Sequence, residues 1–136
     1  MICVFDACAL ISYINDEPGS DIINNLLENA VDGEVEIYMN IINLIEVHYA
    51  NIRNLGKDQA SIILEKIFDA PIQIVSIISD FVFKQAARMK AAYRLSLADA
   101  IGLATALELS GQFVTSDHHE LDTVVENEPI PILWFR

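Results

Sequence analysis

The sequence opens with the run MICVF (residues 1–5), in which every residue is apolar and which ends at the carboxylate of Asp6. An apolar run without polar alternation is typical of a strand that is buried on both faces, as in a parallel sheet. Helical patterns separate this run from four further short apolar runs, at residues 35–38, 72–75, 113–115 and 130–135. Because strands alternate with helices, we predict an α/β fold, a three-layer sandwich around a mostly parallel five-stranded sheet.

Helix-capping and helix-stopping residues bound the predicted helices. Asn40 is a candidate N-cap for a helix that ends before Gly56, and Ser20 is a candidate N-cap for the helix that follows it. Further helices are expected at residues 7–15, 57–68, 80–93, 96–109 and 118–125. Within the helix after Asn40, the apolar spacing predicts a buried stripe formed by Ile41, Leu44, Ile45, His48 and Ile52.

The composition limits the class of protein. The chain has 136 residues, the size of one domain, and 53% of them are hydrophobic against 21% charged, which excludes a disordered chain. Two cysteines are too few for a disulfide framework. No apolar run approaches the ~20 residues of a membrane span, and residues 1–15 lack the basic start of a signal peptide. We therefore expect a single domain over residues 1–136, cytoplasmic and without membrane contact.

The net charge is −12, from 8 basic and 20 acidic side chains, and it is unevenly distributed. Residues 1–52 hold nine acids and no Lys or Arg, whereas residues 53–94 hold seven bases and four acids. The total argues against nucleic-acid binding through a broad electrostatic surface. It leaves room for a local basic strip, or for an acidic site whose charge a metal ion masks.

Four acids lie where the predicted fold concentrates chemistry. Ligands of open α/β sheets bind beyond the carboxyl ends of the strands, and Asp6 and Asp117 follow two such ends. Glu46 borders the apolar stripe of its helix, and Asp99 lies in the first turn of a helix whose other residues are nearly all apolar. A carboxylate so close to the core needs a partner.

Each of these acids also has a structural interpretation. Asp6 and Asp117 are suitable N-caps for the helices that follow them. Asp99 completes the stretch SLAD (residues 96–99), an acidic variant of the capping-box spacing, and Glu46 is compatible with an exposed position beside the stripe. No single acid distinguishes the structural interpretation from the functional one.

Convergence of all four acids would demand a compensating charge. Like charges ~4 Å apart repel by about 4 kcal/mol per pair at an effective dielectric constant of 20. The nearest base in sequence is Arg94, five residues before Asp99. Oxygen ligands favour a hard divalent cation, Mg²⁺ or Mn²⁺, which activates water and stabilises a leaving oxygen at a phosphate. The pattern therefore favours nuclease chemistry by a metal-activated water.

Four blocks of the sequence resemble a known family. They are VFDACAL (residues 4–10), NIINLIEV (residues 40–47), LSLADA (residues 95–100) and FVTSD (residues 113–117). In this order and at these distances they resemble PIN-domain proteins, most of all the VapC toxins of bacterial toxin–antitoxin pairs, over nearly the whole chain. The resemblance implies a sheet of order 3-2-1-4-5, a metal-dependent endoribonuclease, an RNA substrate and a cognate antitoxin protein.

The resemblance also implies roles for individual residues. The catalytic acids and metal ligands that it implies are Asp6, Glu46, Asp99 and Asp117. The side chains expected to support them from nearby are Thr115, Asn40 and Asn43. Family members often carry Thr or Ser directly after the first acid, where this chain has Ala7, so one supporting hydrogen bond is expected to be absent.

One predicted helix and the residue that follows it carry a strip of basic side chains, Lys84, Arg88, Lys90 and Arg94. The strip is either a solvated face or a phosphate-binding surface that guides RNA to the site. After the last acid, His118 and His119 are expected at the surface. The high apolar fraction of the chain also predicts an interface, and we expect a homodimer.

Two other functions remain open at this point. A PIN-like domain could bind a metal ion or hold a protein partner without nuclease activity. A receiver-like protein could accept a phosphoryl group on an Asp, but such sites usually contain a Lys, and no Lys lies near these acids in the sequence.

Overall fold

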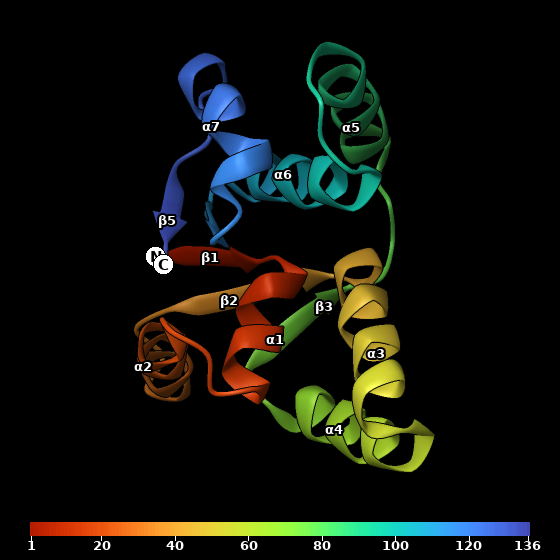
Figure 1. The fold of residues 1–136 in the computed structure, drawn as a ribbon. Coiled ribbons are helices and arrows are strands. Elements are labelled where there is room, and N and C mark those ends of the chain that lie inside the picture. The colour runs from red at the N-terminus through yellow and green to blue at the C-terminus, as the bar shows by residue number, and fades with distance from the viewer.

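Five strands form one sheet in the computed structural model, which describes residues 1–136 (Figure 1). The strands are β1 (Ile2–Phe5), β2 (Glu36–Asn40), β3 (Ile72–Val75), β4 (Gln112–Thr115) and β5 (Ile132–Trp134). Every neighbouring pair is parallel, and the order across the sheet is β3-β2-β1-β4-β5. The predicted α/β class, parallel sheet and strand order are confirmed.

Helices cover both faces of the sheet. They are α1 (Ala7–Ile14), α2 (Ser20–Val31), α3 (Ile41–Leu55), α4 (Lys57–Asp69), α5 (Asp80–Ala92), α6 (Leu97–Leu109) and α7 (His118–Asn127). In Figure 1, α5, α6 and α7 lie on one side of the sheet and α1 to α4 on the other. No helix combines the length and the apolar character that a bilayer span requires.

The central strand β1 shows why its sequence lacks polar alternation. Cys3 and Phe5 point into the core beneath α1 to α4, whereas Val4 points into the core beneath α5 to α7. All three side chains are fully buried. Both faces of β1 therefore lie against apolar layers, as the unbroken apolar run predicts.

The register of β1 and β4 brings their carboxyl ends together. Phe5 lies opposite Val114, and the N–H of Asp6 donates a hydrogen bond to the Val114 carbonyl at 3.2 Å. Asp6 is therefore the first residue beyond β1, and Thr115, the last residue of β4, lies directly beside it. This edge of the sheet is the place where an open α/β fold binds its ligands.

Helix α6 packs closely on β4. A Cβ on Gly102 would lie 2.7 Å from a ring carbon of Phe113 and 3.1 Å from Oδ1 of Asn43. Only glycine permits this approach between helix and strand. The close packing fixes the start of α6, which carries Asp99, against the sheet.

The predicted buried stripe of α3 is wrong in part. Leu44 is buried, but Ile45 is 54% exposed and Ile52 is 41% exposed. The buried face instead carries two polar residues, Asn43 and Asn51, together with Leu44 and Val47. One reason is that α6 packs against this face, where the Ala98 carbonyl accepts a hydrogen bond from Asn43, a polar contact that apolar spacing does not predict.

One helix start differs from its predicted cap, and a second agrees with it. Gly19, not Ser20, caps α2, with φ at +91°, and a Cβ there would lie 2.3 Å from the carbonyl oxygen of Phe135. Ser20 is the first helical residue, and its hydroxyl donates to Asp16. Asn40 caps α3 as predicted, with its Oδ1 accepting from the N–H of Ile42 at 3.0 Å, but it is also the last residue of β2.

Candidate active site

Asp6 is held from two sides at the end of β1. Its Oδ1 accepts a hydrogen bond from the N–H of Ala9 at 2.9 Å, which makes it the N-cap of α1. Its Oδ2 accepts from the hydroxyl of Thr115 at 2.5 Å. The side chain is only 1% exposed, and burial raises the pKa of Asp6 to about 7, against the opposing effect of both hydrogen bonds.

Thr115 connects two of the predicted acids. Its hydroxyl donates to Asp6 and accepts from the backbone N–H of Asp117 at 3.1 Å. The side chain is fully buried at the end of β4. Both hydrogen bonds hold the chain as it leaves the sheet, so Thr115 sets the positions of Asp6 and Asp117 relative to each other.

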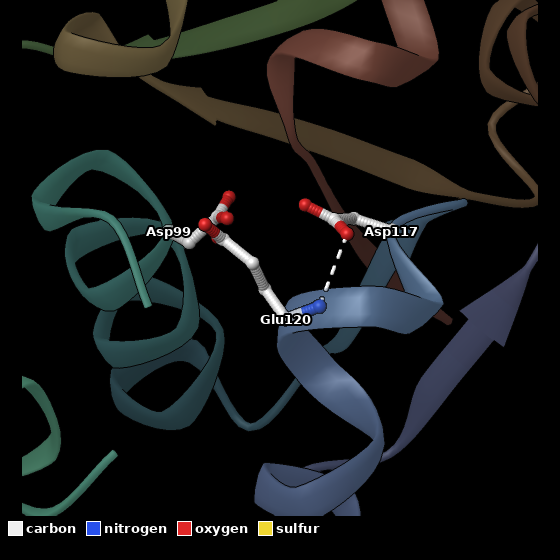
Figure 2. Close-up of side chains that lie close together, drawn as sticks. All are labelled: Asp99, Asp117 and Glu120. Atoms are coloured by element: carbon white, nitrogen blue, oxygen red, sulfur yellow. Dashed lines mark hydrogen bonds between the residues drawn. The ribbon is translucent and has the colours of Figure 1, made fainter. Parts of the chain in front are cut away.

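Asp117 has one oxygen in a helix cap and the other free. Its Oδ1 accepts from the N–H of Glu120 at 3.2 Å and so caps α7. In Figure 2 its second carboxylate oxygen points toward Asp99. The structural interpretation of Asp117 as an N-cap is therefore correct, and it leaves a carboxylate oxygen available for other chemistry.

Asp99 makes only half of the capping box that its sequence suggests. Its N–H donates to the Ser96 hydroxyl at 3.1 Å. The reciprocal bond, however, runs from the N–H of Ser96 to Oε2 of Glu120 at 3.3 Å. The Asp99 carboxylate is thereby left free to face Glu120 and Asp117.

Three carboxylates meet at this edge of the sheet. One oxygen from each of Asp99, Asp117 and Glu120 lies within 4.8 Å of the other two (Figure 2), and we call these residues the carboxylate cluster. Glu120 was missed in the sequence analysis, which considered the four family acids alone. The sequence does contain a signal for Glu120, which follows Asp117 by three residues. Asp117 caps the helix and Glu120 lies in its first turn, so the two acids lie close together at the helix start.

Glu46 lies beside this cluster without belonging to its closest group. It projects from α3 and is half-buried, and burial together with the charge of Glu120 raises its pKa. Its own charge contributes to raising the pKa of Asp6. Glu46 therefore shares the electrostatic field of the cluster.

The carboxylate cluster retains a proton when no cation is present. Burial, which has the largest effect, acts together with a hydrogen bond to Glu120 and the charge of Asp6 to raise the pKa of Asp99 to about 8. The same hydrogen bond lowers the pKa of Glu120. Near pH 7 the more buried Asp99 therefore holds the proton, and Glu120 is ionised.

The comparisons with known proteins show the family and the fold of the chain. A family model described as PIN domain matches residues 3–126. The chain belongs to the PIN domain family. No curated protein gives a match.

Solved structures with the same fold include toxin–antitoxin proteins. The chain superposes on VapBC2 from Rickettsia felis, bound to a promoter DNA fragment, with a TM-score of 0.77 and 18% identity over 98% of each chain. It matches DNA-bound VapBC from Salmonella typhimurium with a TM-score of 0.75 and 15% identity, over 100% of this chain and 99% of the other. It matches VapC20 of Mycobacterium tuberculosis, a toxin that cleaves the sarcin–ricin loop, with a TM-score of 0.64 and 11% identity, over 93% and 95% of the chains.

The donor atoms of this PIN domain fit a hard divalent cation. All candidate ligands are carboxylate oxygens, the type that Mg²⁺ and Mn²⁺ prefer. None of the four ion pairs in the structure involves Asp6, Glu46 or the carboxylate cluster. Burial and the charge of Asp6 raise the pKa of the Cys8 thiol to about 12, so Cys8 is not a thiolate ligand.

Two buried amides join the helices that carry the acids. Asn43 donates to the carbonyl of Ala98 at 3.2 Å, one residue before Asp99. Asn40 donates to the Thr105 hydroxyl at 3.2 Å. Both side chains are fully buried, and they tie α3 to α6. Asn43 lies three residues before Glu46, so it fixes the start of α6 relative to the helix that carries Glu46.

The basic strip is divided by its ion pairs. Lys84 pairs with Asp80 at 3.0 Å, and Arg88 makes two hydrogen bonds to Glu128, at 2.7 and 3.0 Å. Lys90 and Arg94 make no ion pair. His118 and His119, expected at the surface, both begin α7, and the His118 ring stacks on Trp134 with 3.9 Å between ring centroids.

Proposed function

We propose that this PIN domain is a divalent-metal-dependent endoribonuclease and the toxin of a toxin–antitoxin pair. The observation that carries the proposal is the carboxylate cluster, three acids without a basic partner at the carboxyl edge of a parallel sheet. A cation would stabilise carboxylates that lie this close together, one of them buried. The fold is also shared with toxin–antitoxin proteins, one of which is a toxin that cleaves the sarcin–ricin loop.

The side chains have distinct parts in the proposed site. Asp99, Asp117 and Glu120 would hold Mg²⁺ or Mn²⁺ through one oxygen each. Asp6 and Glu46 complete the acidic set, by direct or water-mediated contact. When bound, the ion supplies an activated water and neutralises charge that develops on the phosphate.

The chain itself controls the charge of the site. Asp99 carries a proton near pH 7 in the absence of a cation, because burial raises its pKa to about 8. Loss of that proton gives the cluster the full negative charge that a divalent ion requires. Thr115 donates to Asp6 throughout and keeps its carboxylate oriented at the base of the site.

The proposed partners follow from the same comparisons and from the surface. The structures of VapBC from Rickettsia felis and Salmonella typhimurium are toxin–antitoxin assemblies, and we propose a cognate antitoxin here, with a basic side chain that reaches the acids. The exposed apolar side chains of α3 and α5, which include Ile45 and Phe83, favour a homodimer as the toxin assembly.

An RNA cleavage assay in Mg²⁺, Mn²⁺ and EDTA tests the function. We expect cleavage by the wild type in either ion, none in EDTA, and none by Asp6→Asn, whose circular dichroism spectrum should match that of the wild type. Glu65→Gln removes one charge from the exposed face of α4 and should cleave normally. Cleavage by Asp6→Asn at the wild-type rate, or cleavage that EDTA does not affect, would leave a non-catalytic metal-binding or interaction module as the function.

A further inference from the structure

Two side chains of the basic strip, Lys90 and Arg94, make no ion pair, and they lie beside the carboxylate cluster. A cavity of about 790 Å³ lies between the end of α5, the start of α6 and the start of α7. Its polar lining includes Lys90, Tyr93, Arg94, Ser96, His119 and Glu120. Glu120 belongs to this lining and to the carboxylate cluster, so the cavity and the cluster are continuous.

The charges of the cavity reach the cluster. The hydrogen bond from Asp99 lowers the pKa of Glu120, and the charges of His119 and Lys90 lower it further. A molecule that occupies the cavity therefore has the cations Lys90 and Arg94 on one wall and Glu120, a member of the carboxylate cluster, on another. This is the arrangement that a phosphodiester strand needs if one phosphate is to be cleaved while another is held.

A local cation pair matters in a protein with a net charge of −12. Long-range electrostatics repel RNA from such a surface, so affinity must come from short-range contacts. Lys84 and Arg88 are neutralised by Asp80 and Glu128, which leaves Lys90 and Arg94 as the available cations of the strip. An Arg guanidinium binds phosphate through two parallel hydrogen bonds, and a Lys ammonium adds a point charge.

We infer that Lys90 and Arg94 form a subsite for single-stranded RNA, in which they bind a phosphate adjacent to the one cleaved at the carboxylate cluster. The inference rests on the proposed nuclease function. It divides the basic strip into two parts, because the paired side chains Lys84 and Arg88 have no part in RNA binding.

The test measures RNA affinity apart from catalysis. A fluorescently labelled single-stranded RNA is titrated in Mg²⁺ with Asp6→Asn protein, which prevents cleavage, and with the same protein carrying Lys90→Gln and Arg94→Gln. We expect about tenfold or greater loss of affinity, and a fall of about 0.7 in the salt dependence of log K for the lost phosphate contact. Lys84→Gln removes the same type of charge from the same helix and should change neither quantity.

Three further measurements separate this inference from the proposed function. In otherwise wild-type protein, the Lys90→Gln, Arg94→Gln double variant should raise KM and keep kcat, since the lost contact is made equally in the ground and transition states. The melting temperature and the Mn²⁺ affinity of this double variant should be no lower than those of the wild type, because both side chains are exposed and neither is a carboxylate ligand. Unchanged RNA affinity and salt dependence in a protein that still cleaves would overturn the subsite alone. Wild-type protein that neither binds nor cleaves RNA would overturn the nuclease function and the subsite together.

Discussion

The backbone N–H of Ser96 donates a hydrogen bond to Oε2 of Glu120, although 24 residues separate them in the chain. Glu120 thereby takes the place that Asp99 would occupy in a local capping box. The start of α7 is tied to the start of α6, and the Asp99 carboxylate is free to face its neighbours (Figure 2). The same contact brings a third carboxylate into the group.

The pKa of Asp99 predicts how stability depends on pH. An acid whose pKa rises from 3.8 to about 8 on folding favours the folded state while it is protonated. Its contribution is complete below pH 4 and is lost as the pH rises toward 8. In EDTA, the urea concentration at the unfolding midpoint of the wild type should therefore decrease as the pH rises from 5.5 to 8.5. The decrease should be smaller in Asp99→Asn. Equal pH profiles for the two proteins would contradict the raised pKa.

Metal binding should release a proton. Near pH 7 Asp99 is protonated, and a divalent cation displaces that proton. Mn²⁺ titration by calorimetry in buffers of different ionisation enthalpy should give about one proton released at pH 7. Asp99→Asn should release clearly less, and a buffer-independent enthalpy in the wild type would argue against the assignment.

Glu120 should contribute to metal affinity even though it lies outside the four family acids. Glu120→Gln removes one oxygen of the carboxylate cluster and weakens the capping bond from Ser96. We expect Mn²⁺ affinity to fall at least about tenfold, a typical cost even for residues that only orient ligands. The matched control is Glu65→Gln on α4. Wild-type affinity in Glu120→Gln would confine the metal site to the other acids.

Thr115 should be needed for both stability and the site. Thr115→Val keeps the shape but leaves the N–H of Asp117 without its acceptor and Asp6 without its donor. Loss of such buried partners should lower the free energy of unfolding by about 1–3 kcal/mol, measured by urea denaturation. Thr115→Val should also bind Mn²⁺ more weakly than the wild type, whereas Thr115→Ser retains the hydroxyl and should bind Mn²⁺ as the wild type does. If Val and Ser behave alike, the hydroxyl has no positioning role.

Gly102 should be intolerant of substitution. A Cβ there would lie 2.7 Å from the Phe113 ring, and overpacking of this kind costs about 1–3 kcal/mol. Phe113→Leu makes room, so the Gly102→Ala, Phe113→Leu double variant should be more stable than the sum of the single effects predicts. Strict additivity in a double-mutant cycle would show that helix and strand do not meet as described.

Local patterns were sufficient for most of the fold. The apolar runs located all five strands, because a strand covered on both faces needs little else to be recognised. Capping side chains located the starts of helices, as with Asn40 and Ser96, whose side-chain oxygens accept N–H groups two and three residues later. Asp6 was identified because strand ends are visible in a sequence, whereas Thr115 was identified only through the family resemblance. The two residues are in direct contact at the ends of β1 and β4.

The sequence by itself determined the helices and strands, their succession along the chain, and the presence of acids at the carboxyl ends of strands. The tertiary structure alone decided that Asn43 of α3 is buried, because the Ala98 carbonyl of α6 accepts its hydrogen bond. It alone brought Glu120 into the carboxylate cluster, and it alone separated the paired cations of α5 from Lys90 and Arg94. Each of these outcomes depends on distances between segments far apart in the chain, and local periodicity contains no information about such distances.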